Sequence, residues 1–146
     1  MDTYKAINDI LVHLFNEIWE LEEKAIITEE YKDITNNDMH IIEAIGLGEG
    51  NNMSTIAKKL NITVGSLTTS MNSLVKKKYT ERIRSEEDRR VVYIRLTAKG
   101  KKAYAHHAEF HRRMTEQVVQ QLDTEELSIL EKVLTGLVDF FEQYKD

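Results

Sequence analysis

Residues 53–78, MSTIAKKLNITVGSLTTSMNSLVKKK, decide the fold of this chain. The apolar residues between Met53 and Leu60 recur at helical spacing and predict a helix of two turns. The next three residues form a turn, and Thr63 is a suitable N-cap for the helix that follows. That second helix carries one apolar stripe, formed by Val64, Leu67, Met71, Leu74 and Val75. A helix, a tight turn and another helix predict a helix-turn-helix.

The side of the second helix opposite its stripe is small, polar and uncharged until the last turn. It holds Gly65, Ser66, Thr69, Asn72, Ser73 and Lys76, with Thr68 and Ser70 on the flanks. Such a face fits a DNA major groove, where hydroxyl and amide groups reach base edges and lysines reach phosphates. A merely solvated face is the alternative, but Ser and Thr form helices poorly, and stability alone favours Glu, Lys or Ala. Gly65 either lets the backbone approach a phosphate or meets a packing need of the turn.

Residues 81–96 predict a β-hairpin, or wing, in which strands at 81–84 and 91–96 are joined by a charged loop. Asp88 can pair with a neighbouring arginine, and an arginine at the tip can enter a narrow A·T-rich minor groove. Charged loops are usually only solvated, but the position directly after a helix-turn-helix favours DNA contact. The candidate DNA-binding residues are therefore Gly65, Ser66, Thr68, Thr69, Asn72, Ser73, Lys76, Lys77, Arg82, Arg84, Ser85, Asp88, Arg89 and Arg90.

Charge is distributed unevenly along the 146 residues. The window from Ser54 to Lys102 holds thirteen basic and four acidic residues, a formal charge of +9, whereas the rest of the chain sums to −14. A basic segment within an acidic frame is the electrostatic pattern of a nucleic-acid-binding module. The absence of proline and the low glycine content also predict a mostly helical protein.

The helices outside the window predict a homodimer. Residues 7–21 form an amphipathic first helix, and a short second helix begins after Thr35. A long polar helix runs from about residue 98 toward Leu122, and Asp123 starts a final helix with a continuous apolar stripe. The first and last helices have wider apolar faces than the central region can cover, so we expect them to pack against a second copy. We expect one domain over 1–146, with a DNA-binding lobe at 36–102 and dimerisation regions at 1–34 and 103–146.

The order of these elements, with Asp88-Arg89-Arg90 followed by Leu96-Thr97-Ala98-Lys99-Gly100, resembles the MarR family of winged-helix transcriptional regulators. The similarity covers essentially the whole chain and includes the wing signature, Asp-x-Arg and then Leu-Thr-x-x-Gly. It implies a mostly α fold with a small β-hairpin wing and long terminal dimerisation helices. It also implies that the helix starting at Val64 reads the major groove and that Arg90 reaches the minor groove. Such proteins bind palindromic operators in double-stranded DNA as homodimers and often repress transcription.

Within that family, Met39-His40, residues 64–72 and residues 82–92 are most similar to FabT-type repressors of fatty-acid synthesis genes. This similarity implies an A·T-rich operator in genes for type II fatty-acid synthesis. It also implies that long-chain acyl groups on acyl carrier protein act as corepressor. Apolar residues of the first, second and fifth helices are suited to line an acyl tunnel, although core packing explains them equally well. The alternatives are MarR-type regulators that respond to zinc or to a small aromatic ligand.

The histidines are candidate ligands for a divalent metal, because His107 and His111 share a helix face and His40 lies elsewhere in the chain. Some family members are zinc sensors with histidines on comparable helices. Ordinary solvated or hydrogen-bonded histidines are the alternative, and the chain has no cysteine.

The sequence does not point to an enzyme, a cofactor or a membrane partner. No cofactor is expected, and without a Ser-centred elbow, a phosphate loop or an isolated carboxylate pair we expect no enzyme activity. No signal-peptide pattern or apolar run of about 20 residues is present, which predicts a cytoplasmic protein with no membrane partner.

Overall fold

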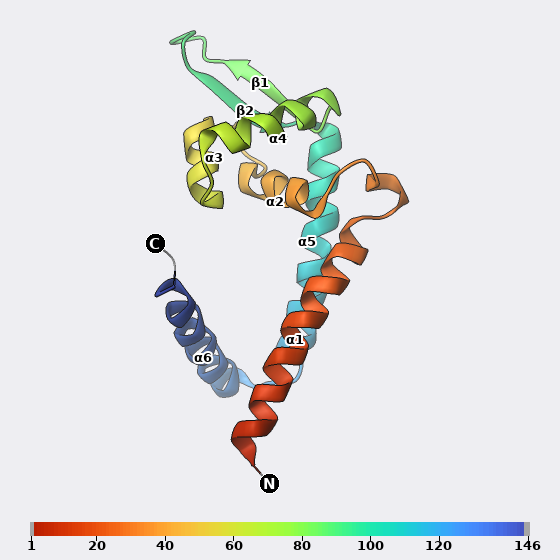
Figure 1. The fold of residues 1–146 in the computed structure, drawn as a ribbon, viewed down its shortest axis with the longest axis vertical. Helices are drawn as coiled ribbons and strands as arrows, with labels where there is room; N and C mark the ends of the chain where they lie inside the picture. Colours follow the sequence, from red (N-terminus) through yellow and green to blue (C-terminus); the bar gives the residue numbers. More distant parts are fainter. Residues whose placement is uncertain (1, 145–146) are drawn as a thin grey trace. The chain divides into compact units, whose positions relative to one another are not determined.

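The computed structural model describes residues 2–144 and divides into two compact units, residues up to Phe110 and residues from His111 onward. The predicted fold, mostly α with a small β-hairpin, is confirmed (Figure 1). The elements are α1 (Thr3–Ile26), a 3₁₀ turn η1 (Glu29–Tyr31), α2 (Asn36–Ile45), α3 (Met53–Leu60), α4 (Val64–Lys76), β1 (Thr80–Arg84), β2 (Val92–Leu96), α5 (Ala98–Val119) and α6 (Thr124–Glu142). The two units are described separately below.

Local capping signals set the helix starts. Thr35 and Asp38 form a reciprocal capping box at α2, Thr63 caps α4, and Asp123 with Glu126 forms a second capping box at α6. These predicted starts are confirmed. Two details differ from the predictions, since α5 ends at Val119, short of Leu122, and the turn η1 had no clear sequence signal.

The wing is an antiparallel pair in which Thr80 lies opposite Leu96 and Arg84 opposite Val92. Asn51 adds a single bridge to Ile94, which ties the segment between α2 and α3 to the wing. Gly50 permits this approach, because its φ is 129° and an added Cβ would lie 2.9 Å from the Ile94 carbonyl oxygen. The glycine-containing connection at residues 46–50 is therefore held at its end by the wing.

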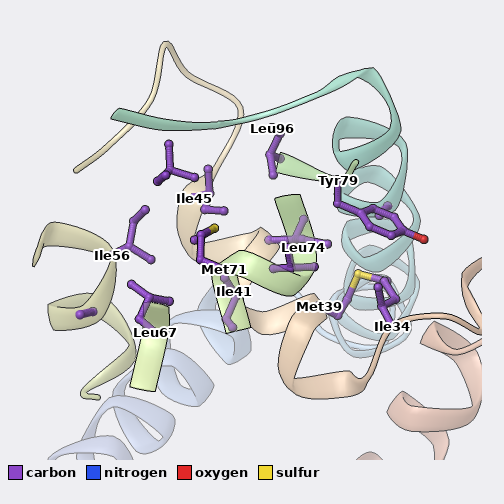
Figure 2. Close-up of a cluster of buried hydrophobic side chains, with 14 of the residues drawn as sticks. Ile34, Met39, Ile41, Ile45, Ile56, Leu67, Met71, Leu74, Tyr79 and Leu96 are labelled. Carbon is purple, nitrogen blue, oxygen red and sulfur yellow. The ribbon is translucent and has the colours of Figure 1, made fainter. Parts of the chain in front are cut away.

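The hydrophobic core lies in the first unit, where α2, α3, α4, the wing and the start of α5 meet (Figure 2). It extends slightly beyond residues 36–102, because Tyr31, Ile34 and Ala103 are also buried. We call residues 31–103 the winged-helix lobe. Its fully buried side chains include Met39, Ile41, Ile42, Ile56, Leu67, Met71, Leu74, Tyr79 and Ile94.

The apolar stripes of α1 and α6 are exposed in the single chain. On α1, Ile10 is 57% exposed and Trp19 70%, and on α6, Val133 is 60% exposed. None of the described residues of α6 is buried. Exposed apolar faces of this extent mark interaction surfaces. None of the helices between residues 2 and 144 combines the length and the apolar character needed to cross a membrane.

Candidate nucleic-acid interface

The polar face of α4 that is predicted to contact DNA, called the reading face below, has its direction fixed by the burial of the opposite side of the helix. Leu67, Met71 and Leu74 are each 0% exposed, so the helix cannot rotate about its axis without opening the core. The sequence-predicted face therefore points outward. Its exposed members are Gly65, Ser66, Thr68, Thr69, Asn72 and Lys76, whereas Ser73 and Lys77 are half-buried.

Internal hydrogen bonds decide what this face offers to DNA. Thr63 Oγ1 and Ser66 Oγ are hydrogen-bonded over 3.1 Å, and Ser66 stays exposed with further hydrogen-bonding capacity. Thr68 Oγ1 donates to the Val64 carbonyl over 2.8 Å, which leaves the Thr68 methyl group for contact. The face thus offers hydrogen-bond donors and methyl groups, which suit the acceptors and the thymine methyl in the major groove.

A contact between α4 and the wing sets the orientation of one further side chain. Asn72 Oδ1 accepts from Arg82 Nη2 over 2.5 Å, which leaves the amide nitrogen of Asn72 as a donor for another partner. The two predicted contact residues are therefore neighbours in space, although they come from different elements.

Gly65 is not required by packing. A Cβ added there would meet only Thr63 Oγ1, at the ordinary contact distance of 3.9 Å, and no positive φ is involved. The packing explanation for Gly65 is therefore not supported, and the approach of the helix N-terminus to a phosphate stays a prediction.

The wing tip is organised by Asp88, and the predicted pairing with a neighbouring arginine is confirmed. Its carboxylate accepts from Arg90 Nε and Nη2, both over 3.0 Å, and also from the Arg90 main-chain N–H. Arg90 is nevertheless 91% exposed. The hydrogen bonds from Arg90 lower the pKa of Asp88 and, in turn, raise the pKa of Arg90. The result is an orientated, permanently charged guanidinium at the tip.

Other predicted contact residues brace this tip. Arg84 Nη1 donates to the Arg89 carbonyl over 2.9 Å, and Ser85 Oγ accepts from the Asp88 N–H over 3.3 Å. The side chains of Arg84, Ser85 and Asp88 therefore hold the loop through hydrogen bonds, and the three arginines Arg84, Arg89 and Arg90 are exposed.

The Leu-Thr-x-x-Gly signature has a packing role that the sequence did not reveal. Thr97 caps α5 by accepting from the Gly100 N–H over 3.1 Å, and its main-chain N–H donates to the Tyr79 carbonyl over 3.1 Å. An added Cβ at Gly100 would lie only 2.1 Å from that same carbonyl oxygen. The signature therefore attaches the first turn of α5 to the end of the helix-turn-helix.

Asp33 contacts a predicted DNA-binding residue, and sequence reasoning missed this contact. It accepts from Tyr79 Oη over 2.7 Å, and Lys77 Nζ donates to its main-chain carbonyl. Lys77, predicted to contact DNA, therefore has a protein partner in this state. No local pattern points to this contact, because Asp33 and Tyr79 are 46 residues apart in the sequence.

Two of the predicted metal-ligand candidates come together in the first unit. His107 Nε2 lies 3.2 Å from Glu22 Oε1, and its Nδ1 lies 3.5 Å from Glu43 Oε2. His40 is beside them. The centre of its ring lies 5.6 Å from the centre of the His107 ring, and its Nε2 lies 3.8 Å from Glu22 Oε1. His111 follows one turn later in α5, where the second unit begins.

A packed helix-turn-helix, an exposed polar face on its second helix and an arginine-tipped hairpin define a winged helix-turn-helix protein, a class that binds DNA. More specifically, the chain belongs to the winged-helix MarR/SarA-type transcriptional regulators, because a family described as "Transcriptional regulator SarA/Rot" matches residues 22–106. It is a DNA-binding transcriptional regulator, and its relatives are regulators rather than enzymes.

Individual relatives agree with this assignment. The crystal structure of Streptococcus pneumoniae FabT in complex with DNA is 39% identical, with a TM-score of 0.84 and coverage of 97% of this chain and 99% of FabT. The transcriptional regulator AdcR of Streptococcus pneumoniae is 32% identical over 108 residues, which cover 72% of this chain and 73% of AdcR. YhjH, an HTH-type regulator of Bacillus subtilis, is 26% identical over 141 residues, covering 88% of this chain and 80% of YhjH. The predicted family and winged-helix fold are therefore confirmed.

Proposed function

We propose that this protein is a homodimeric repressor that binds an A·T-rich palindromic operator through α4 and the wing. The observation that carries the proposal is the exposed polar face of α4 beside a wing tip on which Asp88 orientates Arg90. In this arrangement α4 would read base edges in the major groove, while Arg90 would enter the adjacent minor groove. The similarity to FabT, whose crystal structure contains DNA, supports this geometry.

The remaining predicted contact residues have supporting roles in this proposal. Gly65 would bring the N-terminus of α4 to a phosphate, and Lys76 would add a phosphate contact from the last turn. Arg82, Ser73 and Arg89 lie on or beside the same two surfaces. Two such sets in a symmetric dimer would match the two halves of a palindrome.

Dimerisation is supported by the apolar stripes of α1 and α6. Their exposed members include Ile10, which is 57% exposed, and Val133, which is 60% exposed. A two-fold interface formed by long terminal helices would cover them and hold the two lobes at a fixed spacing. A regulator of this kind would act in the cytoplasm, where it meets bacterial DNA.

The similarity to FabT also supports control of fatty-acid synthesis genes, with acyl chains on acyl carrier protein as corepressor. A corepressor must bind the DNA-competent state more tightly than the free state. DNA affinity should therefore rise when acyl carrier protein that bears a long acyl chain is added. It should stay unchanged when the carrier without an acyl chain is added. Equal affinity in both cases would exclude this effector.

Salt dependence tests DNA binding itself. The probe is a palindromic duplex enriched from a random-sequence pool by the wild-type protein. A dimer that neutralises several phosphates should lose affinity steeply with salt, with a log–log slope steeper than about −3. A shuffled duplex of the same length and composition is the control for sequence preference. A flat salt dependence or equal affinity for both duplexes would contradict the proposed operator binding.

A metal-responsive regulator is the second candidate function, and the histidine cluster favours it. Glu22, His40, Glu43 and His107 offer nitrogen and oxygen ligands of the kind that zinc accepts. The same contacts also describe a metal-free cluster in which both nitrogens of His107 face carboxylates. Stoichiometric Zn²⁺ binding by calorimetry that is lost in His107→Ala and that raises DNA affinity would support this function. Weak, substoichiometric binding would eliminate it.

A further inference from the structure

Three groups from distant parts of the chain converge on Asp33, in the segment that joins α1 to α2. Tyr79 Oη donates to its carboxylate over 2.7 Å, and Lys77 Nζ donates to its main-chain carbonyl. Lys99 Nζ lies 3.7 Å from Asp33 Oδ2 and 4.2 Å from the centre of the Tyr79 ring. We call Asp33, Lys77, Tyr79 and Lys99 the Asp33 clamp.

The donor and acceptor roles in the clamp are fixed. The Tyr79 ring is fully buried in the core, while its hydroxyl points out of the cluster (Figure 2). Burial, and then the hydrogen bond and charge of Asp33, raise the pKa of Tyr79, so the hydroxyl stays a donor. Although burial acts to raise it, the Tyr79 hydrogen bond and the nearby lysines hold the pKa of Asp33 below its ordinary value. The Asp33–Tyr79 bond is therefore charge-assisted.

Tyr79 is joined directly to the end of the reading helix. Lys78 has a left-handed φ of 69°, and the Tyr79 N–H donates to the Leu74 carbonyl over 3.0 Å, which closes the last turn of α4 in a Schellman-type motif. On its other side, the Tyr79 carbonyl accepts from the Thr97 N–H at the start of α5. A displacement of Tyr79 must therefore displace the end of α4.

We propose that Asp33 is a positioning residue that aligns the reading face of α4 with the segment joining α1 to α2. This inference rests on the proposed operator binding. Base-edge contacts need side chains placed to within about 0.5 Å, whereas phosphate contacts by flexible lysines tolerate larger shifts. Release of the clamp therefore weakens operator recognition more than it weakens non-specific DNA binding.

The test compares variants on the enriched palindromic duplex and on its shuffled control. Asp33→Ala should lower affinity for the palindrome about tenfold while affinity for the shuffled duplex is not reduced. Tyr79→Phe keeps the buried ring and removes only the donor, so it should give the same loss. The double variant should lose no more affinity than either single variant, because the two substitutions remove the same hydrogen bond. Asp33→Asn keeps an oxygen acceptor for Tyr79 and should recover most of the affinity.

A matched control separates positioning from charge. Glu49→Ala removes an exposed acid from the same unit and should leave the ratio of the two affinities unchanged. Two results would overturn the inference: variants that change only the melting temperature, or affinities for both duplexes that change in parallel. If the wild-type protein itself fails to prefer the palindrome, the proposed operator binding fails. If the wild type prefers it and Asp33→Ala does so equally, only the role of Asp33 fails.

Discussion

The winged-helix lobe and α6 carry similar apolar periodicity but bury it differently. Met39, Leu67 and Leu74 in the lobe are fully buried within the chain, whereas Val133 and its neighbours on α6 stay exposed. The lobe therefore supplies its own core, and the proposed dimer interface would cover the α6 stripe. The difference separates residues that stabilise the DNA-binding unit from residues that are proposed to dimerise it.

The largest effect should come from adding a methyl group where the backbone of α5 passes closest to Tyr79. Gly100→Ala places a Cβ 2.1 Å from the Tyr79 carbonyl oxygen, and neither backbone can yield without moving α5 away from the wing. We expect the free energy of unfolding to fall by about 3 kcal/mol or more. Urea denaturation followed by circular dichroism measures this change.

Gly48→Ala is the matched control, because an added Cβ at Gly48 meets nothing within 4 Å. It should change the free energy of unfolding by less than about 0.5 kcal/mol. If both alanine variants are equally stable, the close approach at Gly100 does not matter for folding.

A charge on the α6 stripe should break the dimer and leave the lobe folded. Val133→Asp would bury a carboxylate in the proposed interface, so we expect the dimer dissociation constant to rise about a hundredfold. Sedimentation velocity measures the monomer fraction. Thr135→Asp is the control, since it adds the same charge to an exposed position on the opposite helix face. Equal dissociation of both variants would argue against the α6 stripe as the interface.

The lobe's DNA contacts should be separable from its stability. Arg90 is 91% exposed, so Arg90→Ala should leave the melting temperature unchanged. If the guanidinium enters the minor groove, affinity for the palindromic duplex should fall roughly tenfold or more. Lys132→Ala, which removes an exposed cation from α6, is the control variant. Fluorescence anisotropy titrations measure the DNA affinity of both variants. An equal loss of affinity in the two variants would contradict a DNA contact by Arg90 on the wing.

These contrasts also explain which features the sequence could predict. Caps such as Thr63 and the pairing of Asp88 with Arg90 are local, so short patterns were sufficient to find them. The reading face followed from the apolar stripe of one helix. Asp33–Tyr79 and the contact of Gly100 with Tyr79 depend on how distant segments pack, and no periodicity encodes such contacts. For the same reason, the Leu-Thr-x-x-Gly signature could be recognised in the sequence, but its packing against Tyr79 could not be predicted.

The smallest effect should come from Gly65, which compares function with stability inside the lobe. An added Cβ meets only Thr63 Oγ1 at 3.9 Å, so Gly65→Ala should leave stability unchanged or raise it by about 0.5 kcal/mol. The same methyl group would hold the N-terminus of α4 away from a phosphate, so affinity for the palindromic duplex should fall about fivefold. Thermal unfolding and anisotropy titrations on one preparation measure both quantities. Gly100→Ala is expected to destabilise the lobe by overlap, whereas the added methyl group of Gly65→Ala meets no close neighbour. A parallel loss of stability and affinity in Gly65→Ala would therefore show that Gly65 has a packing role.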